Sequence, residues 1–480
     1  MTEAWLKREA SGPAADDAGA VLRGWRVLND RTQVEVAAAL GMTQQHLSQI
    51  ENGQRPLSLD QRRRIVQELG IAADDLGLST GQASQLVARD EASPEIAASR
   101  MRWRTERRWF NQHRSELAQL AAQLYAAEHR VPHTPLIAVP DWLPSEPLEL
   151  GALQLELDEG PQTVLVDGTE AESRAVRPLR TADLLFDSYT AAVKRLDPPR
   201  LFESRPSFRL LETALAAGQL RFGMAAYFDK LDISEALGHE LAAVCMPSGG
   251  PPANVRDLAG RLPFRDHVGD PFDLERRAII PAITTLTIRL RRYPAEPSFL
   301  LHWRDPAKVA TAGGVYDVIP AGEFQPSSVA LWDRRNDFDL WRNIVREYSE
   351  ELLGAPEHDG SRSHPIDYHG WSLYQLLEQG RRDGMLGGFF LGIGLDALTL
   401  AATIPTVVVI DDELFERAFG SCVRFNDEGE IVAVGGGAAA EGVPFTEAAV
   451  RRMLEREPMA SPGAACLALA WKHRGVILGM

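Results

Sequence analysis

The first 80 residues carry apolar positions at the spacing of short amphipathic helices. The regularly spaced apolar residues on either side of Gly41 are Val34, Ala37, Leu40, Leu47 and Ile50. Such spacing places one face of a helix against a core. Thr32 can cap the first helix, and Gly41 can adopt the left-handed backbone that a tight turn requires. The pattern predicts a helix, a short turn and a second helix, with one more helix before this pair and one after it.

The predicted second helix lies in the string TQQHLSQIENG, which runs from Thr43 to Gly53. Gln44, Gln45 and Gln49 share one face of this helix, and His46 lies beside them. A glutamine amide can donate to N7 of adenine and accept from its N6 amino group, so it can read an adenine edge in the major groove of DNA. The face of glutamines therefore indicates a DNA-reading helix.

Residues 18–78 resemble a Cro/C1-type DNA-binding domain of the XRE family, a compact all-α bundle of five short helices. The string TQQ…Q…ENG is similar to the recognition helix of lambdoid phage repressors. The resemblance implies DNA-binding roles for Gln33, Thr43, Gln44, Gln45, His46, Gln49, Asn52 and Arg55. In that assignment the glutamines of the second helix read bases, Gln33 meets a phosphate, and Asn52 and Arg55 hold the DNA backbone. The alternative interpretation is an ordinary helical bundle with a polar face.

Two segments connect this domain to the rest of the chain. Residues 79–96 have the polar composition of a linker, and residues 97–130 predict one long connector helix. The first half of this helix is rich in arginine with interleaved aromatic residues, and the second half carries an apolar stripe. One interpretation is a dimerisation or signalling helix with its basic end near DNA. The other is an amphipathic connector that packs on the next domain.

Residues 135–275 predict an α/β domain of unknown role. The pair His239-Glu240 lies on a predicted helix, but position 243 is alanine, so the HExxH zinc motif is absent. We therefore expect His239 to be a core or surface histidine rather than a metal ligand.

Residues 276–425 carry a second chemical signal. Strand-like segments lead into the helical segment DFDLWRNIVREYSEELLG, where Glu347 and Glu351 share a face and Glu350 lies alongside. Clustered carboxylates of this kind can hold Mg²⁺ against a diphosphate.

REYSEELLG resembles the helical half of a Nudix box, and VIPAGEF resembles the glycine segment that precedes it. The pattern departs from the family because Ser328 stands where a glutamate is expected, about ten extra residues separate the halves, and Gly354 is one position late. The resemblance implies a Nudix-like mixed sheet that binds a nucleotide-like molecule, with or without Mg²⁺-dependent hydrolysis.

The segment 385–410 is long and apolar, but Asp396 and Pro405 interrupt it. We expect a helix leading into a buried strand, TVVVI, rather than a membrane span. Residues 426–480 predict a C-terminal extension of strand and helix.

Composition narrows the class of protein. The 480 residues have a formal net charge of -16, which argues against a protein that coats nucleic acid without selection. Residues 20–70 differ, with seven arginines against five carboxylates. Three cysteines without metal-binding spacing, and no visible signal peptide, fit a cytoplasmic, nucleoid-associated protein.

The whole pattern looks like a long, actinobacterial form of XRE-family regulator. The fold expected is multidomain, with the helix-turn-helix bundle followed by an α/β or α+β part. The expected function is sequence-specific regulation of transcription by a homodimer on double-stranded DNA, with a C-terminal part that senses a ligand or partner. The alternatives are a Mg²⁺-dependent nucleotide hydrolase with an appended DNA-binding module, and an interaction scaffold anchored on DNA.

Overall fold

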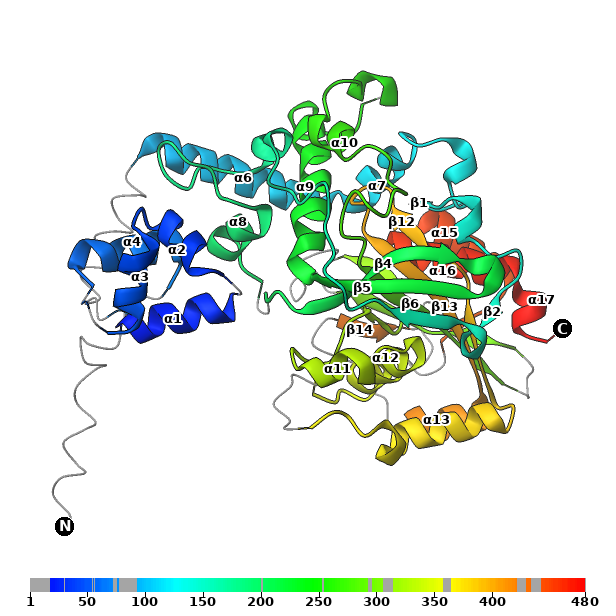
Figure 1. Ribbon diagram of the computed structural model, residues 1–480. Coiled ribbons are helices and arrows are strands. Elements are labelled where there is room, and N and C mark those ends of the chain that lie inside the picture. The colour runs from blue at the N-terminus through cyan, green and yellow to red at the C-terminus, as the bar shows by residue number, and fades with distance from the viewer. Residues whose placement is uncertain are drawn as a thin grey trace, which may run out of the picture. The chain divides into compact units, whose positions relative to one another are not determined.

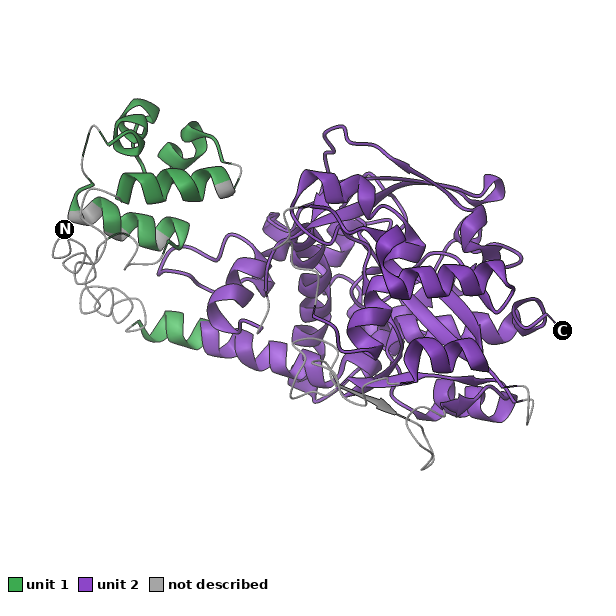
Figure 2. Ribbon diagram, turned by 90° about the horizontal axis from the view of Figure 1, so that it is seen from below, with its two compact units in different colours: residues 1–99 green, residues 100–480 purple. Residues whose placement is uncertain are grey.

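The computed structural model divides the chain into two compact units, residues 1–99 and 100–480 (Figure 2). The residues that the structure describes are 18–29, 31–53, 55, 57–71, 76, 93–199, 202–252, 254–291, 296–304, 314–356, 364–420, 429–432 and 442–479.

The first unit is a helical bundle with its own core. Its helices are α1 (Ala18–Leu28), α2 (Gln33–Ala39), α3 (Gln44–Glu51) and α4 (Leu59–Leu69). Leu22, Leu47 and Ile65 are fully buried at its centre. Gly41, with φ 62°, makes the turn between α2 and α3. The predicted helix, turn and helix are therefore confirmed, whereas most of the segment expected to form a fifth helix lies outside the described residues.

Residues 97–130 do not form the single helix that the sequence predicts. The chain instead forms α6 (Pro94–Gln112) and α7 (Arg114–Ala122), followed by turns and a short 3-10 segment at Ala127–His129. His113 separates the two helices, and its ring stacks on Trp109 with 4.1 Å between centroids while Nδ1 lies 2.9 Å from the Trp109 carbonyl. His113 has φ -116° and ψ 19°, outside the helical region, and this backbone conformation separates the two helices.

The second unit is built around a mixed sheet. The path of this sheet runs β1 (Leu136–Ile137), β12 (Gly394–Asp396), β13 (Ala402–Asp411), β6 (Pro281–Leu290), β7 (Ser298–Phe299) and β15 (Val443–Pro444). Attached to that path are β10 (Ala321–Glu323) on β6, β11 (Leu386–Phe390) on β13, and β2 (Leu148–Glu149) on β11. β6 and β13 run parallel over their full length, from the pair Pro281 and Ala402 to the pair Leu290 and Asp411.

Two smaller sheets flank the mixed sheet. One contains β14 (Gly429–Val432), β8 (Leu301–Arg304) and β9 (Val315–Val318), and the other β3 (Gln154–Leu157), β5 (Gln219–Ala226) and β4 (Pro206–Ala214). The short 3-10 turns of the unit lie at Pro140–Trp142, Leu150–Ala152, Ala171–Val176, Leu215–Ala217, Met246–Ser248, Val255–Leu258 and Tyr368–Gly370.

Helices cover both faces of the mixed sheet, with α12 and α16 on opposite sides of it (Figure 1). The helices of this part are α11 (Leu331–Asn336), α12 (Leu340–Glu347), α13 (Ser372–Arg382), α14 (Asp412–Phe419), α15 (Glu447–Arg456), α16 (Ser461–Lys472) and α17 (Arg474–Ile477). α12 continues into a π-helical turn, Tyr348–Leu352, where the Tyr348 hydroxyl lies 2.8 Å from that of Thr287 on β6. Three further helices, α8 (Tyr189–Leu196), α9 (Tyr227–Cys245) and α10 (Pro263–Val268), form a cluster with α6 and α7.

The boundary expected between residues 275 and 276 does not divide the second unit. β1 pairs with β12 and β2 pairs with β11, so strands from residues 135–275 complete the sheet of the later segment. The Phe208 N–H also donates to the Phe324 carbonyl at 3.1 Å. Because these backbone contacts cross the boundary, the two segments fold as one compact unit.

The apolar segment 385–410 forms β11, β12 and β13, so the helix predicted at its start is wrong and the strand predicted at TVVVI is confirmed. Gly387 and Gly388 disfavour a helix, and both pair with Val409 and Val408 of β13. Among the helices that the structure describes, none combines the length and apolar composition that crossing a membrane requires.

Candidate nucleic-acid interface

α3 is held in place by its capped end and its buried face. The Thr43 hydroxyl accepts a hydrogen bond from the His46 N–H at 3.2 Å, which satisfies one of the free donors at the start of the helix. Leu47 and Ile50 are buried in the core of the first unit. This burial fixes the orientation of α3 about its axis and determines which side chains face outward.

The outward face of α3 carries the three predicted glutamines. Gln44 and Gln45 are exposed, and Gln49 is half-buried. Within the described part of the chain their side chains make no hydrogen bond. Ser48 shares this face, which the sequence interpretation missed, and its hydroxyl lies 3.4 Å from the Asn52 amide nitrogen. The face can therefore offer amide donors and acceptors to a molecule outside the protein.

Glu51 ties three helices together behind this face. Arg26 of α1 donates two hydrogen bonds to its carboxylate, at 2.6 and 2.9 Å, and Gln33 of α2 donates a third at 2.8 Å. Burial alone would raise the pKa of the Glu51 carboxyl, but the hydrogen bonds from Arg26 and Gln33 outweigh it and hold that pKa below its ordinary value. Glu51 therefore stays ionised and fixes α3 against α1 and α2.

Glu51 was assigned no role in the sequence analysis. Its position four residues after Leu47 was the available signal, because a charged residue on a buried face needs a partner. The same contact qualifies the expectation for Gln33. Its side-chain amide is directed to Glu51, while its backbone N–H at the start of α2 belongs to the groups that have no partner within the helix.

The remaining predicted residues flank α3. His46 is half-buried, and its Nε2 lies 3.4 Å from the Gln61 amide nitrogen on α4. Asn52 and Arg55 are exposed just beyond the end of α3. A depression beside the turn is lined by Met42, His46, Gln61 and Arg64 among others. The structure thus brings the predicted residues together around α3, with His46 turned toward α4.

Residues 22–76 match the helix-turn-helix family. The match spans the helix pair α2 and α3 and supports a DNA-binding domain of the XRE type, and with it a DNA-binding regulator. Comparison with curated proteins and with solved structures gave no match. In this helix-turn-helix domain α3 occupies the place of the second helix, which is the one that enters the major groove.

The three predicted metal ligands lie at the end of α12 and in the π-helical turn. The Ala321 N–H of β10 donates to Glu351 at 2.9 Å, and the Asn343 amide donates to Glu347 at 3.2 Å. A Cβ at Gly322 would lie 2.1 Å from the Glu347 carboxyl carbon, so this carboxylate packs directly on β10. Glu350 is half-buried beside them.

Metal binding by these three glutamates stays a prediction. In the part of the chain that the structure describes, no three His, Cys, Asp or Glu side chains are grouped so as to hold a metal ion. Glu351 is directed to a backbone N–H, and Glu347 receives an amide hydrogen bond. The carboxylates therefore link α12 to β10.

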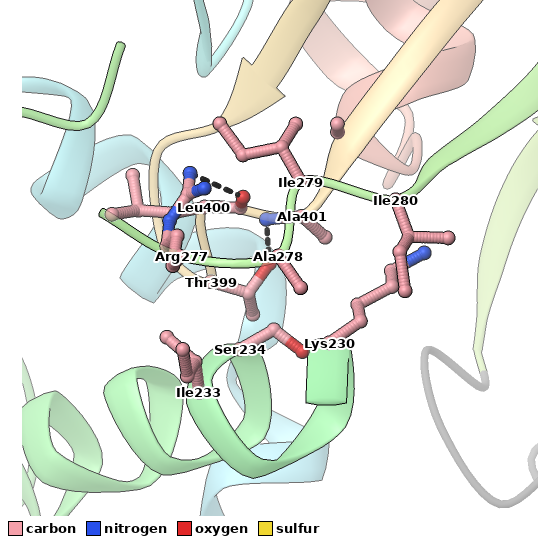
Figure 3. Close-up of a pocket in the computed structure, with 11 residues that line it drawn as sticks. Lys230, Ile233, Ser234, Arg277, Ala278, Ile279, Ile280, Thr399, Leu400 and Ala401 are labelled. Carbon is pink, nitrogen blue, oxygen red and sulfur yellow. Dashed lines mark hydrogen bonds between the residues drawn. The ribbon is translucent and has the colours of Figure 1, made fainter. Parts of the chain in front are cut away.

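A small cavity in the second unit lies between α9 and the turn before β13. It is lined by Lys230, Ser234, Arg277 and Thr399 among others (Figure 3). Its volume of about 10 Å³ is roughly that needed for one water molecule. The cavity is too small for an organic ligand.

Proposed function

We propose that the protein is a sequence-specific transcriptional regulator that reads DNA with α3. The observation that carries this proposal is the face of Gln44, Gln45 and Gln49, which is directed away from the core on the second helix of a helix-turn-helix domain. Glutamine amides discriminate bases, and a helix held by Glu51 can present them with little loss of conformational freedom on binding. Asn52 and Arg55 supply contacts to phosphates.

The proposed regulator binds as a homodimer. α3 is only eight residues long, so one copy contacts few base pairs. Two copies would read half-sites about one DNA turn apart, as helix-turn-helix dimers do. The acidic net charge of the whole chain disfavours binding that depends on many phosphate contacts. It therefore favours a dimer in which each copy binds through a few base contacts.

Selection from a pool of random duplexes tests this function. The full-length protein should enrich one motif with two related half-sites, and because few phosphates are contacted, binding to that motif should weaken only moderately as salt rises. Enrichment of no motif, with binding that depends on salt alone, would contradict the proposed sequence-specific reading.

We propose further that the second unit has a Nudix-like fold and senses a nucleotide-like effector without hydrolysing it. Support comes from the parallel pair β6 and β13 between α12 and α16, and from the contact of the REYSEELLG segment with the glycine of VIPAGEF. Glu351 accepts from the Ala321 N–H and Glu347 from the Asn343 amide, and these contacts favour a structural role for both carboxylates, and so sensing over hydrolysis.

A nucleotide panel in Mg²⁺ separates sensing from the hydrolase alternative. We expect no hydrolysis, and we expect at least one nucleoside diphosphate derivative to raise the melting temperature of the second unit. Hydrolysis that is lost in Glu351→Gln would establish the alternative instead.

A further inference from the structure

α9 carries five ionisable side chains that bond to neighbouring parts of the chain. Four are buried, Lys230, Glu235, His239 and Glu240, and Asp232 is half-buried. Buried charges seldom add stability compared with apolar residues, but they can specify one arrangement of the elements that they join. The middle of α9 contacts α6, the helix in which the second unit begins.

Glu235 and His239 hold the inner face of α6. Arg107 donates to Glu235 at 3.2 Å, and Arg114 at the start of α7 donates to the same carboxylate at 2.7 and 2.8 Å. His239 is fully buried, with its ring stacked on Trp103 at 5.8 Å between centroids. Of the two places that the sequence left open for His239, core or surface, the structure shows the core, and the histidine has polar partners on both ring nitrogens.

The hydrogen bonds around His239 run in one direction. Arg107 lies 3.3 Å from the Tyr189 hydroxyl, that hydroxyl lies 2.9 Å from Nδ1 of His239, and Nε2 lies 3.1 Å from a Glu106 carboxylate oxygen. The carboxylate can only accept, so Nε2 must carry a proton. Because Arg107 can only donate, the Tyr189 oxygen accepts from it and its own hydrogen points to Nδ1. One neutral tautomer of His239 satisfies all four groups.

A second proton on His239 breaks this chain. Nδ1 would become a donor, so the Tyr189 hydroxyl could no longer donate to it and the buried Tyr189 hydrogen would lose its acceptor. An imidazolium would also lie in a buried site beside the Arg107 cation. Burial lowers the pKa of His239, and Arg107 lowers it further, against the opposing effect of Glu106.

We propose that Arg107, Tyr189, His239 and Glu106 form a proton-sensitive latch on α6, closed when His239 is neutral and opened when His239 is protonated. The latch deepens the proposed sensing role and rests on it, because α6 connects the second unit to the DNA-reading end of the chain. The ionisable groups that face His239 are Glu106 and Arg107 from α6, Arg114 from α7, Tyr189 from α8 and Glu235 from α9.

The sign of the pH dependence follows from the lowered pKa. The contribution of His239 to stability is present above its ordinary pKa and is lost as the pH falls through its lowered value. Two carboxyls on α9 act in the opposite sense. Burial raises the pKa of Asp232 to about 6 and that of Glu240 to about 7, so their contributions are present in acid and lost as the pH rises. A variant at His239 is therefore needed to isolate the latch.

Hydrogen exchange of the full-length protein without DNA tests the latch. As the pH is lowered from about 8 through and below the ordinary histidine pKa, and after correction for intrinsic exchange rates, protection of the α6 amides should fall about tenfold in the wild type once His239 is protonated. His239→Gln keeps one donor and one acceptor but cannot gain a proton, so its α6 protection should not fall as the pH is lowered, and protonation of Asp232 and Glu240 can only raise it. The exposed His369→Gln is the matched control and should behave like the wild type.

Glu106→Gln is a second test of the latch. Because Glu106 lies at the edge of the cluster, this variant should fold. Loss of this carboxylate should move the acid transition of Trp103 fluorescence to lower pH, since the imidazolium loses its stabilising partner. An unchanged acid response in His239→Gln, or an unchanged midpoint in Glu106→Gln, would overturn the latch. Neither measurement involves DNA, so failure of the latch is distinguishable from failure of the proposed DNA reading.

Discussion

α3 and α9 are both helices rich in polar side chains, but they use those side chains in opposite ways. The glutamines of α3 face away from the core and make no hydrogen bonds within the described part of the chain, whereas α9 buries Glu235 and His239 among fixed partners. Outward amides can bond to another molecule at little desolvation cost. Buried charges hold neighbouring helices in one arrangement. The outward polar side chains of α3 therefore form a recognition surface, whereas the buried charges of α9 join it to neighbouring helices.

Glu51 is a buried charge on α3, the same helix that carries the outward glutamines. We expect its removal to have the largest effect on stability among the variants considered. Glu51→Ala leaves the Arg26 guanidinium and the Gln33 amide without their shared acceptor, which should destabilise the first unit by about 3 kcal/mol. Hydrogen exchange of the α3 amides measures this loss. Unchanged protection would show that α3 does not depend on its buried anchor.

Gly238→Ala should disturb the α9 connection by a smaller amount. A Cβ at this position would lie 2.3 Å from Cζ of Phe110 on α6, so the two helices would have to separate. We expect a loss of about 1–3 kcal/mol in thermal unfolding of the second unit. Gly24→Ala in α1 is the matched control, because nothing lies within 4 Å of its Cβ and alanine favours a helix. Equal losses in both variants would refute the close contact between α9 and α6.

Arg55→Ala tests whether the recognition surface separates base reading from backbone contact. Arg55 is exposed beyond the end of α3, so its loss should weaken binding to all sequences alike and reduce the salt slope by about 1. Titrations of a selected site and of unrelated duplexes at several salt concentrations measure both quantities. A loss confined to the selected site would instead assign Arg55 to base reading.

Ser48→Ala should have the smallest effect. Ser48 shares the face of the glutamines, but its hydroxyl is directed toward Asn52, and the change should alter stability by less than about 0.5 kcal/mol. The base preference of the selected site should be retained. If the variant instead loses its base preference at one base pair, Ser48 also reads a base, and the glutamines account for fewer positions of the site.

The first unit could be predicted from sequence because its signals are local. Thr32 and Gly41 act on residues within a few positions of themselves, and the structure shows both in their expected roles. The α9 connection could not be predicted in this way. Arg107 and Glu235 are separated by 128 positions, and a periodic pattern of residues cannot predict a contact over that distance in sequence.

The apolar segment at 385–410 shows a different limit. Hydrophobic runs do not distinguish a buried strand from a buried helix, and only the pairing of Gly387 and Gly388 with β13 decides between them. The predicted boundary after residue 275 failed for a similar reason, because β1 finds its partner, β12, more than 250 positions away.

The central claim is that the glutamines of α3 read individual bases. Selection from random duplexes with the wild type and with Gln44→Ala and Gln45→Ala tests it most directly. Each variant should retain the motif but lose the preference at one base pair per half-site, by about 1–3 kcal/mol. A uniform loss of affinity at every position, or a motif unchanged in both variants, would contradict it.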